Sequence, residues 1–552
     1  MIRRMRSRAA NACLVGAIAL LLTIVMTWPF APRIFSAGRT NSGDGMYSVW
    51  NVAWVAHALV ADPRHLYDAN IYAPHRRTLT FSEPNIGAGL LAVPFYWSSG
   101  RNPHFAHNAV LLLAFVLALV GAYSLVRHLS GDRGAAAVAA AAFAFCPYVF
   151  SHIPHIQLLM TAGIPFSLLA MHRFVAAPTA GRAIVLGLVL AAQALSCGYY
   201  GIFAGLLVGY GLLFYSGSRQ GWREPRYWLG VALAAAVSIA VVLPFFVPYL
   251  ALARDAGFSR SLEAAVPYSA NWRSYFVSSA WTHRWALPYL RPWAEVLYPG
   301  TIAIVFGLLG LRGLRRRGAP AAGRDHVVFY ASVVVLAIWF SLGPQAGLYT
   351  VLYRALPIVF SWMWAPQRMG LICVLGLAVL AGFAIASWTS RSRRPVLLTG
   401  ILVAITCADL FVAPLRLVEP PKVSPVYTTL ASLPDGVVAE FPFFYRRPDF
   451  YRHTEYMLYS TTHWKPLVNG YSDHIPMDFR EVVMTIARFP DPGAFRILRA
   501  RHVRYVVVHL DLYGDAAGTM ARLMQPYLQY LRPLHTAGDV TLYEIANWPP
   551  SR

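Results

Sequence analysis

The segment HNAVLLLAFVLALVGAYSLV (107–126) indicates the fold class of the chain. It runs for 20 residues without Asp, Glu, Lys or Arg, and the loop RHLSGDR (127–133), with two arginines, follows it directly. A helix that crosses a membrane needs about 20 predominantly apolar residues. The segment therefore predicts a membrane-spanning helix that ends in a basic loop.

Runs of the same kind recur through the first 416 residues. We predict eleven spans, near 10–30, 107–126, 134–150, 155–173, 182–198, 200–216, 227–252, 296–314, 326–343, 367–388 and 396–416. Only Gly198, Tyr199 and Tyr200 separate the two apolar runs within 182–216. Whether this stretch forms one span or two is therefore left open.

Arginine marks one side of these spans. With the N-terminus inside, the cytoplasmic pieces are MIRRMRSR, RHLSGDR, HRFVAAPTAGR, GSRQGWREPR, LRGLRRRGAPAAGR and SRSRR, and each is rich in Arg. The short opposite turns at 151–155 and 198–200 contain no Lys or Arg. Because basic residues concentrate in cytoplasmic loops, this pattern predicts an inside N-terminus and an extracytoplasmic C-terminal segment.

Composition and charge support a membrane protein. Apolar residues make up 57% of the chain and charged residues only 13%, which argues against a water-soluble enzyme. Residues 417–552 carry 14 basic and 13 acidic residues, so nearly all of the net charge of +23 lies among the apolar runs. Nucleic acid is therefore not a predicted partner. Only Lys422 and Lys465 are lysines, and this bias towards arginine is typical of GC-rich bacterial coding. Together with the apolar runs, it leads us to predict a multi-pass protein of the bacterial inner (plasma) membrane.

The chain is predicted to have two parts. Residues 1–416 form a polytopic α-helical membrane domain with long outer loops at 32–106, 253–295 and 344–366. Residues 417–552 form a periplasmic α/β domain, with strands expected at 436–441, 504–510 and 540–545 and helices near 426–433, 453–462, 477–488, 492–500 and 516–530.

Acidic residues are scarce before residue 417, so each one there is informative. Asp44, in GDGMYSVW after the first span, is the main catalytic candidate, because a carboxylate there can act as general base or hold a metal ion. The alternative for Asp44 is a helix N-cap. Glu83, in LTFSEPNIG, is the second catalytic candidate, and its alternative is a cap or a turn.

Basic side chains near the outer ends of the spans are candidates for binding phosphate. Arg368 lies at the mouth of the tenth span, and its forked donors suit a lipid phosphate. His152 and His155 follow the third span with a spacing that would place them on one face of a helix. The alternatives are a snorkelling arginine and interfacial histidines without a role.

Polar and aromatic residues concentrate in STTHWKPLVNGYSDHIP (460–476). Aromatic rings suit the C–H faces of sugars, and the candidates for acceptor binding are Trp50, His463, Trp464, Lys465, Asn469 and Tyr471. The alternative is a structured turn built on Asn469–Gly470. The chain contains no GxSxG, Walker A, HExxH or CxxC motif, so the sequence gives no support to a hydrolase, an ATPase or a zinc enzyme.

In this arrangement the chain resembles the membrane glycosyltransferases of the GT-C-fold superfamily, in a poorly characterised bacterial branch. The resemblance is carried by GDGMYSVWNVAWV (43–55), FCPYVFSHIPHIQLL (145–159), APQRMG (365–370) and HWKPLVNGYSDHIP (463–476). It implies transfer of a sugar from a polyprenyl-phosphate donor to an acceptor glycan, lipid or protein on the outer membrane face, by inverting displacement.

The resemblance also implies roles for the candidates. Asp44 matches the acidic residue of the first outer loop that serves as base or metal ligand, and Arg368 is assigned to the donor phosphate, helped by His152 or His155. Glu83 would shape the acceptor side. The paired acidic motif of the family is absent, because Asp44 is followed by Gly and Met. The identity of the base and a requirement for a divalent cation, Mg²⁺ or Mn²⁺ with Asp44 as ligand, therefore stay open.

Two other classes of function compete with a transferase. A transporter or flippase of lipid or polysaccharide predicts ionisable residues deep within several spans, whereas Asp409 is the only acidic residue in the predicted spans. A non-catalytic envelope scaffold predicts tolerance of Asp44→Asn.

Overall fold

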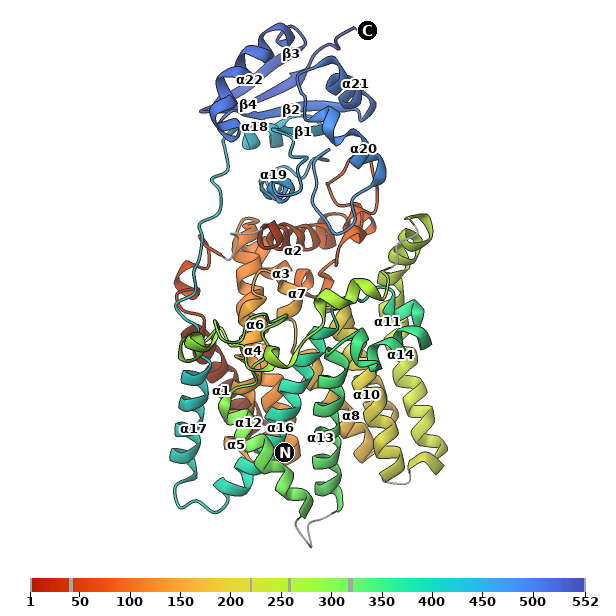
Figure 1. Ribbon diagram of the computed structural model, residues 1–552, viewed down its shortest axis with the longest axis vertical. Coiled ribbons are helices and arrows are strands. Elements are labelled where there is room, and N and C mark those ends of the chain that lie inside the picture. The colour runs from red at the N-terminus through yellow and green to blue at the C-terminus, as the bar shows by residue number, and fades with distance from the viewer. Residues whose placement is uncertain (1, 39–42, 219–220, 257–259, 316–320, 551–552) are drawn as a thin grey trace. The chain divides into compact units, whose positions relative to one another are not determined.

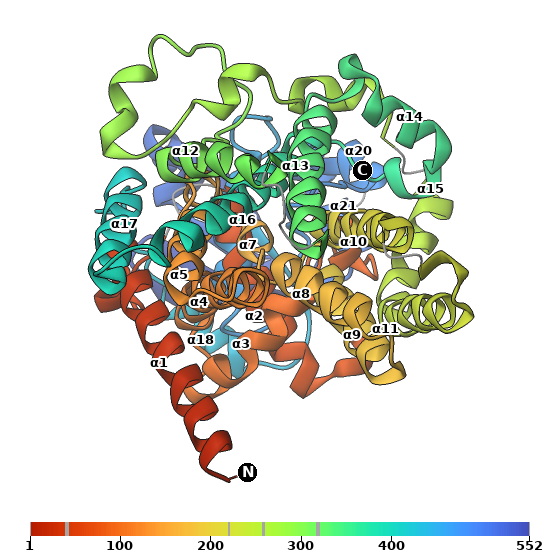
Figure 2. The same ribbon diagram turned by 90° about the horizontal axis from the view of Figure 1, so that it is seen from below.

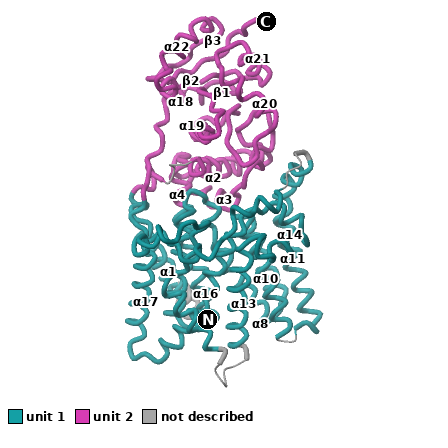
Figure 3. Tube along the Cα trace, viewed as in Figure 1, with its two compact units in different colours: residues 1–32, 110–415 teal, residues 33–109, 416–552 magenta. Residues whose placement is uncertain are grey.

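The computed structural model describes residues 2–38, 43–218, 221–256, 260–315 and 321–550 and is built mainly of helices (Figure 1). Two compact units divide the chain. Unit 1 comprises Met1–Pro32 and Val110–Leu415, and unit 2 comprises Arg33–Ala109 and Arg416–Arg552 (Figure 3). The predicted division at residue 416 into a membrane part and an outer part stays a prediction.

Unit 1 is helical. Its helices are α1 (Ile2–Met26), most of α4 (Pro103–Ser130), α5 (Arg133–Ala144), α6 (Pro147–Ser151), α7 (Ile156–Leu159), α8 (Gly163–Ala176), α9 (Ala180–Ser196), α10 (Gly198–Ser218), α11 (Pro225–Ala256), α12 (Thr301–Gly310), α13 (Ala321–Ser341), α14 (Leu348–Ala355), α15 (Pro357–Phe360), α16 (Gly370–Thr389) and α17 (Pro395–Asp409). Short 3-10 segments join several of them, including η10 (Pro366–Met369), which leads into α16.

Seven stretches of helix within the described residues are long and apolar enough to cross a membrane. They are Pro103–Ser130, Arg133–Ser151, Ile156–Ala176, Gly198–Ser218, Pro225–Arg254, Gly323–Ser341 and Pro366–Thr389. The other four predicted spans coincide with shorter apolar helices, at Ala10–Met26, Ala180–Ser196, Thr301–Gly313 and Pro395–Asp409. The chain is thus a multi-pass membrane protein, and the count of eleven spans stays a prediction. The stretch 182–216 forms two helices, α9 and α10, that pack on each other.

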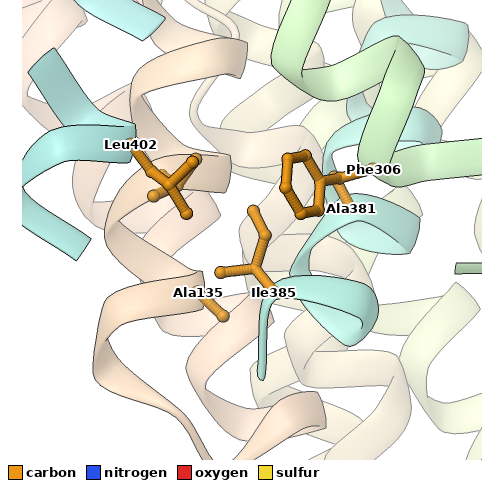
Figure 4. Close-up of a cluster of buried hydrophobic side chains, with 6 residues drawn as sticks. Ala135, Phe306, Ala381, Ile385 and Leu402 are labelled. Carbon is orange, nitrogen blue, oxygen red and sulfur yellow. The ribbon is translucent and has the colours of Figure 1, made fainter. Parts of the chain in front are cut away.

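Small residues let the helices of unit 1 approach closely. A buried cluster joins α5, α12, α16 and α17 through Ala135, Val138, Phe306, Ala381, Ile385 and Leu402 (Figure 4). In α12, a Cβ added at Gly310 would lie only 2.3 Å from the carbonyl oxygen of Leu380 in α16. Glycine is therefore required at this crossing, as small residues are in many membrane helix pairs.

Unit 2 joins two distant segments of the chain. Backbone hydrogen bonds link Asn70, Tyr72 and Ala73 to residues 467–469, at 2.7–3.2 Å. Its helices are α2 (Gly43–Ala61), α3 (Ile86–Ser98), α18 (Val426–Ser432), α19 (His453–Ser460), α20 (Met477–Ile486), α21 (Pro492–Ala500) and α22 (Ala517–Met524). The first long loop predicted from the sequence therefore forms one compact unit with the C-terminal segment.

A four-stranded sheet in the order β1-β2-β4-β3 confirms the predicted C-terminal sheet domain. Its strands are β1 (Val437–Phe441), β2 (Val503–His509), β3 (Leu531–Ala537) and β4 (Val540–Ile545). The first two pair in parallel and are almost entirely buried, and the other two pairings are antiparallel. The buried apolar side chains of the first two strands explain why both are recognisable in the sequence.

The edge strand β3 is not among the strands predicted from the sequence. Its sequence, LRPLHTA, is at least partly exposed at every position but the first and contains a proline, and its register shifts between Pro533 and His535. Proline within a sheet is confined to edges and bulges, where its missing N–H costs no ladder bond. An exposed edge strand has no apolar pattern by which the sequence could reveal it.

Candidate active site

Asp44 lies in the first turn of α2, in unit 2, where a negative charge is favoured by the helix dipole. The Tyr471 hydroxyl donates a hydrogen bond to Oδ1 of Asp44 at 3.0 Å. Asp44 is half-buried, and a Cβ added at the preceding Gly43 would lie 2.6 Å from Cβ of Tyr451. The start of the helix is thus packed against the chain, and the carboxylate is held by a hydroxyl far away in sequence.

Further acidic and phenolic groups surround this turn. The ring centroid of Tyr47 lies 6.2 Å from that of Tyr471 in an edge-to-face arrangement. Both Glu83 and Asp473 interact electrostatically with Tyr47. We call Asp44, Tyr47, Glu83, Tyr471 and Asp473 the Asp44 cluster. The structure thus brings Asp44 to Tyr471 and Glu83 to Tyr47, two tyrosines whose rings are in edge-to-face contact.

Hydrogen bonds hold the Glu83 segment against α2. The side-chain amide of Asn51 donates to the Tyr47 hydroxyl at 3.2 Å and to the Glu83 backbone carbonyl at 3.3 Å. The backbone N–H of Asp473 donates to the Ser82 hydroxyl at 2.9 Å. The positions of Glu83 and Asp473 are therefore fixed by neighbours in the same unit.

The tyrosines of the cluster remain protonated at neutral pH. Burial raises the pKa of Tyr47, and burial together with the charge and hydrogen bond of Asp44 raises the pKa of Tyr471. A protonated Tyr471 is a steady donor to the carboxylate. A hydrogen bond donated to an ionised carboxylate favours the ionised form and holds the carboxylate in one orientation.

Two of the predicted acceptor-binding residues, Trp50 and Asn469, are fully buried. The indole nitrogen of Trp50 donates to Oδ1 of Asn70 at 3.1 Å. The side-chain amide of Asn469 pairs with β1, accepting from the Glu440 N–H at 2.8 Å and donating to the Glu440 carbonyl at 3.0 Å. Both residues therefore support the fold of unit 2, and a role for them in binding an acceptor stays a prediction.

Three further candidates, at positions 463–465, also have partners within unit 2. Lys465 is almost fully buried and donates from Nζ to the Leu433 carbonyl at 2.8 Å. Trp464 stacks on His57, with ring centroids 5.1 Å apart. His463 accepts at Nδ1 from the Lys465 N–H at 2.9 Å. Of the six predicted acceptor-binding residues, Tyr471 is thus the one that the structure joins to Asp44 through a hydrogen bond.

Two buried histidines make the stability of unit 2 depend on pH. Burial lowers the pKa of His453 to about 4 and that of His463 to about 3. Below pH 6.5 the unfolded chain binds protons that the folded unit does not, so stability falls as the pH falls from 6.5 towards 4. We expect His453→Gln to remove about 3 kcal/mol of this pH dependence, measured by hydrogen exchange of peptides from unit 2. An unchanged pH dependence in His453→Gln would contradict the assignment.

Arg368 lies in η10, in unit 1, and is half-buried. Its guanidinium carbon lies 4.4 Å from the ring centroid of Tyr199, in the first turn of α10. The Tyr199 hydroxyl accepts a hydrogen bond from the Trp364 N–H at 3.0 Å. Arg368 also interacts electrostatically with Tyr148 and Tyr200, whose hydroxyls lie 3.0 Å apart. The arginine is thus held among phenol groups and keeps its charge.

The two predicted histidines lie between short helices rather than on one helix. His152 follows α6 and His155 precedes α7, and their ring centroids are 6.1 Å apart. Nε2 of His152 lies 3.4 Å from Oε2 of Glu295, a buried carboxylate. Tyr148 interacts electrostatically with both Glu295 and Arg368. We call Tyr148, His152, Tyr199, Glu295 and Arg368 the Arg368 cluster.

Glu295 is one of five cluster residues that the sequence did not single out, together with Tyr47, Asp473, Tyr148 and Tyr199. It is one of few acidic residues in the predicted outer loops, and that scarcity was the available signal. Its partner His152 belongs to a distant segment, so the pairing depends on the fold. Asp44 lies in unit 2 and Arg368 in unit 1, so the two clusters are features of different units.

The described ranges of the chain offer no donor set for a metal ion. Within them, no three His, Cys, Asp or Glu side chains gather closely enough to hold one. The requirement for a divalent cation stays as the sequence left it, and the steps proposed for Asp44 involve none.

No family model matches the chain, and no curated protein matches it by sequence. Solved structures do match. The oligosaccharyltransferase of Archaeoglobus fulgidus in its apo form has a TM-score of 0.52 at 15% sequence identity, and the match covers 97% of this chain and 74% of the archaeal chain. Archaeal oligosaccharyltransferase AglB from Archaeoglobus fulgidus, in complex with an inhibitory peptide and a dolichol-phosphate, has a TM-score of 0.51 at 13% identity, over 98% and 74%.

Arabinofuranosyltransferase AftD from Mycobacteria has a TM-score of 0.56 at 15% identity, over 97% of this chain and 41% of its own. All of these proteins are GT-C glycosyltransferases. The chain has the GT-C fold. The likeness covers nearly the whole chain, and at these identities it concerns the fold. The resemblance seen in the sequence is thereby confirmed at the level of the fold.

Proposed function

We propose that this GT-C-fold chain is a membrane glycosyltransferase that takes a sugar from a polyprenyl-phosphate donor. The acceptor is a glycan, lipid or protein on the outer face of a bacterial inner membrane. The observation that carries the proposal is the half-buried Asp44 carboxylate, held by the Tyr471 hydroxyl at 3.0 Å. The proposed topology has eleven spans, an inside N-terminus and a periplasmic C-terminal segment. The arginine-rich loops support this topology.

Asp44 is proposed as the general base. The acceptor hydroxyl oxygen attacks the anomeric carbon of the sugar, its proton passes to the Asp44 carboxylate, and the bond from that carbon to the phosphate oxygen breaks. One displacement inverts the anomeric centre. A positioned base contributes about 10²–10⁴-fold to such a step. Glu83 is proposed to shape the acceptor side, which its electrostatic interaction with Tyr47 supports.

Arg368 is proposed to bind the donor phosphate, which leaves with the electron pair of the broken bond. Its forked N–H donors match phosphate oxygens, and the aromatic ring of Tyr199 packs against its guanidinium group. His152 and His155 are proposed to assist, with Glu295 orienting His152. AglB has been solved with a dolichol-phosphate, which supports a lipid phosphate as the leaving group of a protein with this fold.

A deletion strain tests the proposed function. Envelope glycans and lipid-linked sugars are compared in the deletion strain carrying wild type or an empty vector. We expect the deletion to lose a sugar from an envelope glycan, to accumulate that sugar on its lipid carrier, and to recover with wild type. Accumulation of the finished glycan on the inner face would contradict a transferase and indicate a flippase.

Replacing Tyr471 by Phe tests the link between the hydroxyl and the base. Without the donor at 3.0 Å, the Asp44 carboxylate loses the hydrogen bond that orients it. We expect transfer to fall by about tenfold or less, measured as the initial rate at neutral pH. The exposed Tyr445→Phe serves as control. Transfer by Tyr471→Phe at the wild-type rate would contradict the assignment.

A further inference from the structure

The segment between α11 and α12 exposes a set of large aromatic side chains. Trp272 is 63% exposed, Trp285 is 73% exposed and Tyr289 is 81% exposed, and Phe276 and Trp281 are also exposed. We call residues 268–293 the aromatic loop. Figure 2 shows the light green chain of this region along the periphery of the helices of unit 1. Soluble surfaces rarely expose so many aromatic side chains together.

Arginines accompany these rings. The guanidinium carbon of Arg284 lies 3.4 Å from the ring centroid of Trp281, that of Arg273 lies 5.3 Å from Trp272, and that of Arg291 lies 5.7 Å from Trp293. Residues 264–294 contain no Asp or Glu. The aromatic loop is therefore both apolar and positively charged and has no acidic residue of its own, and the Asp409 carboxylate of α17 lies 3.1 Å from His283 of the loop.

Polar contacts fix the backbone of the aromatic loop to unit 1. The Trp281 indole nitrogen donates to the Ala413 carbonyl at 2.8 Å. The Ala270 N–H donates to the Ser341 carbonyl at 2.8 Å, and the Trp281 N–H donates to the Phe411 carbonyl at 3.0 Å. Within the loop, Arg273 donates to the Arg291 carbonyl at 3.1 Å. The exposed rings are therefore carried on an anchored framework and do not need to be ordered when a partner binds.

We infer that the aromatic loop is a docking surface for the anionic phospholipid headgroups of the membrane. Tryptophan and tyrosine favour the interface between lipid and water, where the ring is apolar and its N–H or O–H stays hydrated. Arginines near the surface are attracted to anionic lipids. Charge complementarity therefore selects anionic over zwitterionic headgroups. This inference does not depend on the proposed transfer reaction.

Thermal unfolding of the full-length protein in detergent tests the inference. The melting temperature is followed as phosphatidylglycerol or phosphatidylcholine is added, at low and at high salt. A lipid that binds the folded state raises the melting temperature by mass action. We expect phosphatidylglycerol to stabilise wild type more than phosphatidylcholine does, with the difference reduced by salt.

The triple variant combines Arg273→Gln, Arg284→Gln and Arg291→Gln. To reach the same rise in melting temperature as wild type, it should need about fivefold more phosphatidylglycerol for each arginine removed. Arg223→Gln is the matched control, because Arg223 lies 4.5 Å from the ring of the exposed Trp222 in the connection between α10 and α11. An equal melting temperature without lipid shows that the variants are folded.

Three outcomes would overturn the inference. The first is an equal response of wild type to both lipids, and the second is an unchanged response in the triple variant. The third is stabilisation by a polyprenyl phosphate alone, which would make the aromatic loop a site for a lipid carrier rather than for the membrane surface.

Discussion

Asp44→Asn abolishes most of the transfer activity, with an expected loss of about 100-fold or more. The amide keeps the shape of the side chain and still accepts from the Tyr471 hydroxyl, but it cannot take up the proton of the acceptor hydroxyl. The measurement is the recovery of the envelope sugar in the deletion strain, with the amount of variant in the membrane fraction confirmed.

Asp62→Asn is the matched control for Asp44→Asn. Asp62 follows the other end of α2, is exposed and pairs with His65 at 2.8 Å. We expect it to restore the sugar as wild type does. Full recovery with Asp44→Asn would show that Asp44 only supports the start of the helix, and the proposed base would be wrong.

Arg368→Gln is expected to lower transfer by about 10²–10³-fold, the range seen when one donor to a developing negative charge is removed. The loss should appear mainly in kcat, because the phosphate gains charge as the bond breaks. Arg368→Lys keeps the charge but loses the forked donors, so we expect partial recovery. Initial rates with the lipid-linked sugar measure both variants.

The exposed Arg354→Gln in α14 is the matched control for Arg368→Gln. An equal melting temperature of the variants and wild type separates loss of chemistry from loss of the packing on Tyr199. Normal transfer by Arg368→Gln would show that Arg368 is a snorkelling residue and would contradict its assignment to the phosphate.

The membrane fold could be predicted because it depends on local patterns. Apolar runs and arginine-rich loops are recognised from neighbouring residues, and the buried strands β1 and β2 are short apolar runs bounded by turns. The edge strand β3 lacks such a pattern because it is exposed. The grouping of residues 33–109 with the C-terminal segment depends on contacts between distant parts of the chain.

The same distinction applies to the candidate site. Asp44 is recognisable as a rare acidic residue beside a span, but its partner Tyr471 lies 427 residues away. Glu295 is recognisable only because acidic residues are scarce in this part of the chain, and its contact with His152 depends on the fold. Trp50 and Asn469 are of residue types expected in a sugar-binding site, but both are fully buried. No local sequence pattern distinguishes a buried side chain of these types from one that is exposed and binds a sugar.

Turnover of a lipid-linked sugar gives the decisive test of a transferase that uses Asp44. Membranes of the deletion strain supply the accumulated lipid-linked sugar, and purified wild type or Asp44→Asn is added in proteoliposomes. We predict that wild type releases polyprenyl phosphate and moves the sugar to the acceptor, whereas Asp44→Asn leaves the lipid-linked sugar intact. A lipid-linked sugar that stays intact with folded wild type would contradict the proposed function.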